Sequence, residues 1–251
     1  MKIAVMSDLH IEFEPYRPDL PSDIDVVILA GDIALGTDGM EWAKENLTNH
    51  QVIYVAGNHE FYRHDLHPTL EALKAASNDH VHFLENEQIE IDGVRFLGCT
   101  YWTDCASNGT PEISAGNVAG ALNDFHGAIM NGERKFTIGD ALDLHRQSRT
   151  WLEAELAKDY PGKTVVVTHH APVIHAGAPM FHGGPISPGF ENAHEDLVAK
   201  SGARLWCFGH THYDYDRIVG NDCRVVSSQR CYPKERARMG LPAFEPKIVE
   251  V

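Results

Sequence analysis

The sequence predicts an α/β fold with a mixed sheet, and three observations support this. Short β-branched and apolar runs recur along the chain, each ending abruptly in polar residues or glycine. Helix-like stretches lie between these runs, an alternation typical of sheets covered by helices on both faces. Two pairs of runs are joined by short polar turns, which is typical of antiparallel hairpins. The predicted sheet therefore contains both parallel and antiparallel pairs.

The elements follow in chain order from these patterns. The clearest strands are predicted over residues 3–6, 26–30, 52–55, 94–98, 164–167 and 205–208. A helix is predicted over residues 141–158, where Leu144, Trp151, Leu152 and Leu156 share one face and Pro161-Gly162 ends the pattern. A weaker helix follows Asp65.

Turn residues define two hairpins and loop residues define two irregular stretches. The hairpins are predicted over 88–98, around Asp92-Gly93, and over 216–226, around Gly220-Asn221. Residues 100–140 and 175–189 are rich in glycine and other loop formers, so both are predicted to be irregular walls facing a substrate. We predict one domain spanning residues 1–251.

Composition restricts the function. The chain has 251 residues, 43% of them hydrophobic and 23% charged, as in ordinary globular proteins. Its net charge of −15 disfavours nucleic-acid polymers and anionic membranes as partners, unless bound cations reverse the local field. The 16 histidines supply the commonest metal ligand and acid–base group, which raises the question of where cations would bind.

Cysteine usage and hydropathy indicate a compartment. The five cysteines are odd in number and include no Cys-x-x-Cys pair, which favours a reducing compartment over a disulfide framework. No apolar run approaches the roughly 18 residues that a membrane-spanning helix needs. A cytoplasmic location without a membrane anchor is the expectation.

Potential metal ligands follow five of the predicted strands. The motifs are Asp8-x-His10, Gly31-Asp32, Gly57-Asn58-His59-Glu60, His169-His170 and Gly209-His210-x-His212. Each alone could be an ordinary turn or helix cap. Together they would meet where the carboxyl ends of parallel strands share an edge. Oxygen and imidazole donors without thiolate suit Mn, Fe, Zn or Co, and the number of donors is enough for two ions sharing a carboxylate.

This ordered motif set, spanning residues 8 to 212, resembles that of the calcineurin-like metallophosphoesterases. The resemblance implies a four-layer α/β/β/α sandwich with two mixed sheets and a dinuclear metal site, holding Mn, Fe or Zn. It also implies ligands for one metal (Asp8, His10, His212), ligands for the other (Asn58, His169, His210), a bridging carboxylate (Asp32) and a proton donor (His59).

The implied reaction is hydrolysis of a small phosphate ester. A metal-bridging hydroxide would attack phosphorus while His59 protonates the leaving group. The protein phosphatase branch continues Gly-Asp with an arginine-containing signature, but here Gly31-Asp32 is followed by Ile33-Ala34-Leu35-Gly36. This departure disfavours a protein phosphatase and favours a phosphodiesterase, with a phosphomonoesterase as the alternative.

Groups outside the motifs are candidates for substrate contact. Arg230 ranks first, because a guanidinium binds phosphate in a bidentate manner, followed by Asn123 and His126. Tyr232 and His182 could also reach the substrate. His170 is expected to pack near the site or contact the substrate. A carboxylate from among Glu60, Asp38 and Asp214 is expected to orient the ligating imidazoles.

Two other classes of function fit the motifs less well than hydrolysis of phosphate esters. A non-catalytic scaffold with the same fold would be expected to have lost metal ligands, and none of the seven is missing. A metal-dependent amide hydrolase built on a barrel would show His-x-His after its first strand, where this chain has Asp8-x-His10.

Overall fold

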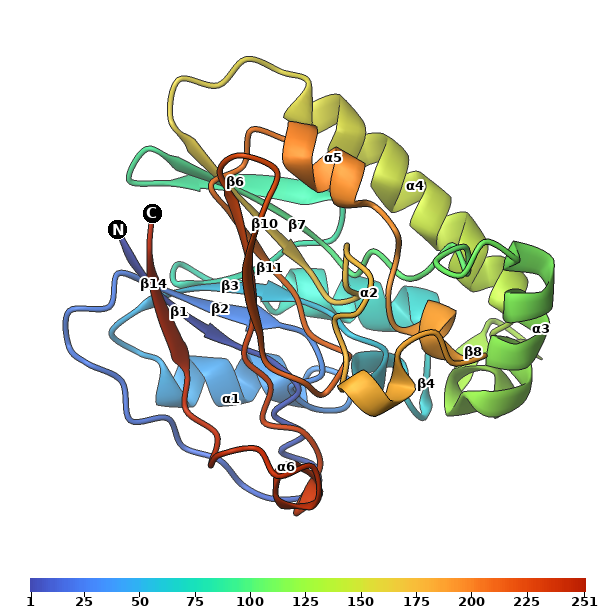
Figure 1. The fold of residues 1–251 in the computed structure, drawn as a ribbon. Helices are drawn as coiled ribbons and strands as arrows, with labels where there is room; N and C mark the ends of the chain where they lie inside the picture. The colour runs from blue at the N-terminus through green and yellow to red at the C-terminus, as the bar shows by residue number, and fades with distance from the viewer.

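The computed structural model describes residues 1–251, and its strands form two large sheets that pack face to face (Figure 1). The first sheet has the strand order β14 (Lys247–Glu250), β1 (Lys2–Met6), β2 (Val26–Ala30), β3 (Gln51–Val55) and β5 (Val81–Phe83). Its last four strands are parallel, and β14 runs antiparallel to β1. This pairing brings the two chain ends side by side.

The second sheet has six strands in the order β12 (Tyr215–Val219), β13 (Cys223–Ser227), β11 (Leu205–Cys207), β10 (Lys163–Thr168), β7 (Val94–Cys99) and β6 (Glu87–Ile91). The four central strands are parallel, and both edge strands pair in antiparallel hairpins. The two predicted hairpins and the α/β class with mixed sheets are thereby confirmed. A small third sheet joins β4 (His64–Asp65), β8 (Ile129–Asn131) and β9 (Arg134–Lys135).

Three apolar clusters alternate with the sheets. Alternate side chains of a strand point to opposite faces, so Ile3 and Val5 enter the cluster between the sheets, whereas Ala4 and Met6 face helices. Helices α1 (Asp38–Asn46) and α2 (Leu66–Ala75) pack on the outer face of the five-stranded sheet. Helices α4 (Ile138–Leu156) and α5 (Glu195–Lys200) cover the outer face of the six-stranded sheet. Burial on both faces explains the continuous apolar strand runs.

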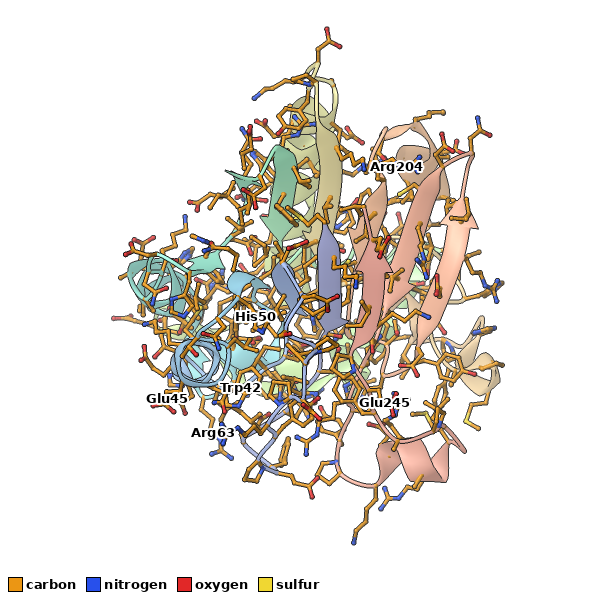
Figure 2. All side chains as sticks on the ribbon, turned by 90° about the vertical axis from the view of Figure 1, so that its left-hand side faces the viewer. Trp42, Glu45, His50, Arg63, Arg204 and Glu245 are labelled. Atoms are coloured by element: carbon orange, nitrogen blue, oxygen red, sulfur yellow. The ribbon has the colours of Figure 1, made fainter.

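Figure 2 shows the side chains in a view turned by 90°. Trp42 and Glu45 mark α1 at one side, and Arg204, just before β11, lies at the opposite end. Trp42 is buried against the five-stranded sheet, and its indole nitrogen donates a 2.9 Å hydrogen bond to the carbonyl of Tyr16.

Local capping explains where the helices begin. The long helix α4 starts three residues before the predicted one, because the Thr137 and Asp140 side chains form a reciprocal capping box. Asp65 caps α2 as its position in the sequence indicates. The stretch 100–140 was expected to be irregular, but it contains α3 (Pro111–Ala121), β8 and β9.

The second irregular stretch agrees better with expectation. Residues 175–189 hold only two single-turn 3₁₀ segments, at Pro179–Phe181 and Ser187–Gly189. The last helix, α6 (Glu235–Arg238), is one turn long. None of the helices combines the length and apolar character that crossing a bilayer requires.

Candidate metal centre

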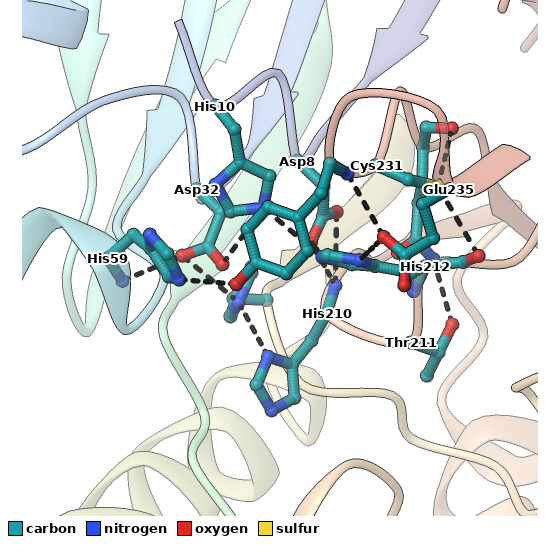
Figure 3. Close-up of polar contacts among 12 residues, drawn as sticks. Asp8, His10, Asp32, His59, His210, Thr211, His212, Cys231 and Glu235 are labelled. Carbon is teal, nitrogen blue, oxygen red and sulfur yellow. Dashed lines mark hydrogen bonds and ion pairs between the residues drawn. The ribbon is translucent and has the colours of Figure 1, made fainter. Parts of the chain in front are cut away.

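The seven predicted ligands lie together at the carboxyl ends of five strands. Figure 3 shows Asp8, His10, Asp32, His210 and His212 among them. Asp8 and His10 follow β1, Asp32 follows β2, and Asn58 follows β3, all in the five-stranded sheet. His169 follows β10, while His210 and His212 follow β11 in the other sheet. The expectation of one shared sheet edge is therefore corrected to the edges of two sheets. An isolated bridge between Ser7 and Gln229 joins these edges beside the site.

One group of donors surrounds Asp8. His212 Nε2 lies 3.3 Å from Asp8 Oδ1 and 3.2 Å from His10 Nε2. His10 Nε2 lies 3.8 Å from Asp32 Oδ2. Two carboxylates and two imidazoles thus converge on one point.

A second group of donors lies on the other side of Asp32. His169 Nε2 is 3.4 Å from Asp32 Oδ1, 3.2 Å from Asn58 Oδ1 and 3.2 Å from His210 Nδ1. Asp32 therefore presents one carboxylate oxygen to each group, which is the arrangement expected of a bridging ligand.

The hydrogen bonds of the histidine rings show which ring nitrogen carries the proton. They indicate that the ring nitrogens facing the site have free lone pairs. His169 Nδ1 contacts the Ala30 carbonyl at 2.9 Å, so Nδ1 carries the proton and Nε2 has a free lone pair. His10 and His212 likewise turn Nδ1 to carboxylates and Nε2 to the site. Acceptors facing acceptors in a buried place are unfavourable unless a cation lies between them. The residues present therefore fit two metal ions.

The pKa shifts agree with this interpretation. Burial lowers the pKa of His10 and of His169 to about 4, so both rings are uncharged near pH 7 and can donate a lone pair to a metal ion. Burial raises the pKa of Asp32 well above its usual value, and repulsion from Glu60 and Asp8 adds to the rise. A buried carboxylate in such a position is stabilised as an anion by nearby cations.

Asp8 and His212 form a pair within the first group. Burial raises the pKa of Asp8, but its hydrogen bond with His212 and the charges of the surrounding histidines together outweigh burial and lower that pKa to about 2. Burial lowers the pKa of His212, yet hydrogen bonds to Asp8 and Glu235 raise it to about 9. Asp8 also accepts the backbone N–H of His210 at 3.0 Å, which ties the ends of β1 and β11 together.

Two glutamates orient the proposed ligands, and both differ from the carboxylates that the sequence predicts for this role. Glu12 Oε1 contacts His10 Nδ1 at 3.2 Å, and Glu235 Oε2 contacts His212 Nδ1 at 2.6 Å. Glu12 is two residues from His10, a spacing that could have indicated it. Glu235 follows His212 by 23 residues and is brought back by the turn into α6, which local sequence does not indicate.

The carboxylates expected to orient imidazoles act elsewhere. Asp214 forms an ion pair with Arg236, and Asp38 is exposed in the first turn of α1. Glu60 is fully buried and accepts the backbone N–H groups of Asp32, Ile33 and Gly57 and the hydroxyl of Tyr54. Glu60 therefore fixes the loops after β2 and β3, not an imidazole ring.

Two glycines permit the close approach of chain segments at the site. A Cβ atom on Gly57 would lie 2.1 Å from Asp32 Oδ1 and 2.6 Å from His169 Cε1. A Cβ atom on Gly209 would lie 2.6 Å from Asp8 Oδ2. Any larger side chain at these positions would displace the proposed ligands.

Asp124 orients Asn58. The Asn58 Nδ2 group donates to Asp124 Oδ1 at 2.9 Å, which turns the amide oxygen toward His169. Tyr62 donates its hydroxyl to the same Asp124 oxygen at 2.7 Å. Asn123, which precedes Asp124 in the sequence, lines both cavities that are described below. His126 is exposed and lines neither cavity. The structure thus brings Asn123 to the site and leaves His126 away from it.

His59 lies at the edge of the two donor groups. Its Nδ1 contacts Glu12 Oε1 at 3.0 Å, and its Nε2 contacts the hydroxyl of Tyr232 at 2.8 Å. Its backbone N–H donates to Asp32 Oδ1 at 2.8 Å. His170 packs behind the site, with its ring 4.1 Å from that of His210.

Arg230 was the first-ranked phosphate contact, and the structure gives it a different role. Its guanidinium donates to the carbonyls of Leu9, Glu14 and Pro15 and to the Glu14 carboxylate. It also stacks over the ring of Tyr16, 5.0 Å from the centroid. With its donors used in this way and no place in either cavity wall, Arg230 anchors the loop after β1.

Two cavities open beside the site. The first, about 540 Å³, is bordered by the proposed ligands Asp32, Asn58, His210 and His212 and by parts of both stretches predicted to face a substrate. The second, about 510 Å³, contains Phe13 and Arg63. His59 and Tyr232 line both cavities and stand between them.

Two donor groups sharing one carboxylate, at the carboxyl edges of an α/β fold, are typical of hydrolases that use two metal ions. The chain belongs to the calcineurin-like phosphoesterase family, whose model matches residues 1–214. The family is dimetal-dependent, so the chain is a metal-dependent phosphoester hydrolase by family and site.

The chain is also similar to a curated relative and to solved structures. Uncharacterized protein L509 of Acanthamoeba polyphaga mimivirus is 25% identical over 278 residues, covering 96% of this chain and 95% of the relative. The fold is similar to that of a phosphopantetheinyl hydrolase from Mycobacterium tuberculosis, with a TM-score of 0.72, 20% identity, and coverage of 99% of this chain and 95% of that one. It is also similar to a dimetal phosphatase from Danio rerio, with a TM-score of 0.50, 15% identity, and coverage of 91% and 87%.

Proposed function

We propose that the protein hydrolyses a small phosphodiester at a dinuclear metal site. The observation that carries the proposal is the position of Asp32, whose two oxygens face two separate groups of imidazole and carboxylate or amide donors. Bound there, two cations would neutralise the phosphate and lower the pKa of a water molecule enough to supply a nucleophile near neutral pH.

The chain's own residues then have distinct tasks. Asp8, His10 and His212 would hold one ion, Asn58, His169 and His210 would hold the other, and Asp32 would be shared between them. Mn, Fe and Zn all suit this set of donors. Glu12 and Glu235 fix the rings that face the site.

His59 acts as the proton donor. Glu12 holds its Nδ1 and so leaves Nε2 to deliver the proton toward the cavities. Tyr232 occupies that path in this structure and either transfers the proton onward or yields its place to the leaving oxygen. Both possibilities keep His59 as the source of the proton.

A diester is favoured over a monoester by the surroundings of the site. Neither cavity supplies an arginine directed at the metal donors, and one free cation, Arg63, lies in the second cavity. The two cavities flanking His59 provide room for two ester groups. A phosphomonoesterase is the alternative. A non-catalytic scaffold is disfavoured, because all seven donors are present and face one another.

The proposed substrate is a free small molecule, not a nucleic-acid polymer, in line with the net charge of −15. All five cysteines are free, which supports the proposed cytoplasmic location.

The test combines metal content with turnover. Protein purified without chelator is expected to hold two metal ions per chain and to hydrolyse bis-p-nitrophenyl phosphate faster than p-nitrophenyl phosphate. Asp32→Asn is expected to lose at least one ion and at least a hundredfold in kcat, whereas Asp19→Asn, at an exposed carboxylate, is the matched control. Metal-loaded protein that hydrolyses no mono-, di- or cyclic ester would contradict the proposal, and faster turnover of monoesters would reverse the preference.

A further inference from the structure

We infer that the first cavity binds one ester group of the substrate, and that this group is elongated, uncharged and largely apolar. The inference rests on the proposed function, because it assumes that the scissile phosphate lies at the metal donors. Beyond the proposed function, the inference specifies the chemical class of the group attached to that phosphate.

The wall of the cavity leads away from the metal donors as an apolar surface. It begins at Phe190, whose ring stacks on that of His210 with centroids 4.9 Å apart. It continues outward through Ile186, Phe181 and Met180. Ala121 and Leu122, at the end of α3, complete the lining. A group attached to a phosphate at the donors would enter directly between these walls.

The apolar side chains of the outer wall are unusually exposed. Phe181 is 62% exposed and Met180 is 76% exposed, although they lie near each other on one 3₁₀ turn. Neighbouring exposed apolar side chains on a cavity wall are typical of a binding surface, since covering them with an apolar ligand removes them from water.

The charges of the cavity exclude a second anionic group. No lysine or arginine lines it, whereas the carboxylates of Asp124, Glu191 and Glu235 do, besides that of Asp32. A second phosphate or a carboxylate on the bound group would lack a cationic partner and would face these carboxylates. The other groups of the wall that can carry positive charge are histidines, of which His59, His210 and His212 belong to the proposed catalytic centre and His182 lies outside it. Metal ions bound at the donors would attract the scissile phosphate itself.

The volume agrees with a group of moderate length. The cavity measures about 540 Å³, within the range of sites that enclose most of a small organic ligand. The second cavity, with Arg63, remains for the other ester group.

A series of p-nitrophenyl phosphodiesters with methyl, butyl and octyl groups tests the inference. We expect kcat/KM to rise on the order of tenfold or more from methyl to octyl, mainly through KM, because each buried methylene group adds to binding in ground state and transition state alike. A diester with a carboxylate at the end of the alkyl chain is expected to lose most of this gain.

Variants show whether the gain comes from this cavity. Phe181→Ser and Met180→Ser are expected to flatten the dependence on chain length, and both positions are exposed, so folding is not at risk. Ile113→Ser is the matched control, because Ile113 is an exposed apolar residue of α3 outside both cavities.

The outcomes separate the inference from the proposed function. Turnover of all diesters with no dependence on chain length, or a dependence that Phe181→Ser and Met180→Ser leave intact, would overturn the inference while the hydrolase remains. Equal or better turnover of the carboxylate-ended diester would overturn it as well. Absence of turnover with every ester would instead count against the proposed function.

Discussion

Five of the seven proposed ligands have left-handed backbone conformations, which residues other than glycine seldom adopt. The φ angles are 51° at Asp8, 47° at His10, 56° at Asp32, 69° at His210 and 49° at His212. Each such residue costs on the order of 1 kcal/mol or more, and such strain is typical of functional sites. The cost is tolerated because side-chain to backbone hydrogen bonds, such as that from His210 N–H to Asp8, fix these turns.

The role of His59 leads to a prediction at the scale of one residue. His59→Asn is expected to keep both metal ions, because the ring is directed at Glu12 and Tyr232 and not at either donor group. A lost proton donor slows poor leaving groups most, so turnover of alkyl diesters should fall about a hundredfold or more, and turnover of p-nitrophenyl esters much less. Steady-state kinetics on both classes, with metal analysis, measures this.

The matched control is His67→Asn, at an exposed histidine on α2. Equal losses with good and poor leaving groups in His59→Asn would show that His59 does not supply the proton. Loss of metal from that variant would show that the contact of the His59 ring with Glu12 holds the ligands in place.

At the scale of elements, α4 depends on its N-terminal cap. Asp140 accepts the Thr137 backbone N–H at 2.8 Å and two hydrogen bonds from the Arg134 guanidinium. Asp140→Ala is therefore expected to lower the free energy of unfolding by about 1 kcal/mol, with metal content unchanged. Urea unfolding at pH 7 measures the difference.

The stabilisation that Asp140 provides, measured with the Asp140→Ala variant, is expected to decrease at low pH. The hydrogen bond from Arg134 lowers the pKa of Asp140 below its usual value in the folded state. The stabilisation is thus fully present above the pKa of an unfolded aspartate and is lost as the pH falls through the folded pKa. The difference between wild type and Asp140→Ala should shrink below about pH 4. A difference that is constant from pH 7 to pH 3 would contradict the assigned role.

The elements that the sequence predicted are those whose signals are local. Continuous apolar runs defined the strands, and the spacing of apolar residues defined α2 after Asp65 and α4 before Pro161-Gly162. Helix α3 was missed because Gly116 and Gly120 weaken its helical propensity and its apolar residues do not repeat on one face. The division into two sheets depends on strand pairing over long distances, which a local pattern does not contain.

The same distinction applies to the site. The motif residues were predictable because each follows a strand directly. Glu235 and Asp124 orient ligands through long-range packing, so local sequence does not indicate that role. Tyr232 was predicted as a candidate for substrate contact, and it lines both cavities. Arg230 illustrates the converse case: a residue type suited to phosphate is instead satisfied by the backbone carbonyls of the 9–15 loop.

At the scale of the whole molecule, the metal centre lies where the two sheets meet. Asp8, Asp32 and Asn58 belong to the five-stranded sheet, and His169 and His210 belong to the six-stranded one. The sheets also contact each other through the apolar cluster, the bridge from Ser7 to Gln229 and the hydrogen bond from His210 N–H to Asp8. Bound ions would therefore crosslink the sheets and also neutralise the buried carboxylates.

Removal of the metal is expected to destabilise the protein. Chelator-treated protein titrated with Mn²⁺ should gain roughly 3 kcal/mol when the free metal reaches a hundred times its Kd, which corresponds to a Tm increase of roughly 5–10 °C for a chain of this size. Asp32→Asn should lose most of this shift. Asp140→Ala should start from a lower Tm and show the same shift, since its cap is far from the donors in sequence and makes no contact with them. Calorimetry measures both, and a Tm independent of Mn²⁺ in the wild type would mean that these donors do not bind the metal in the folded state.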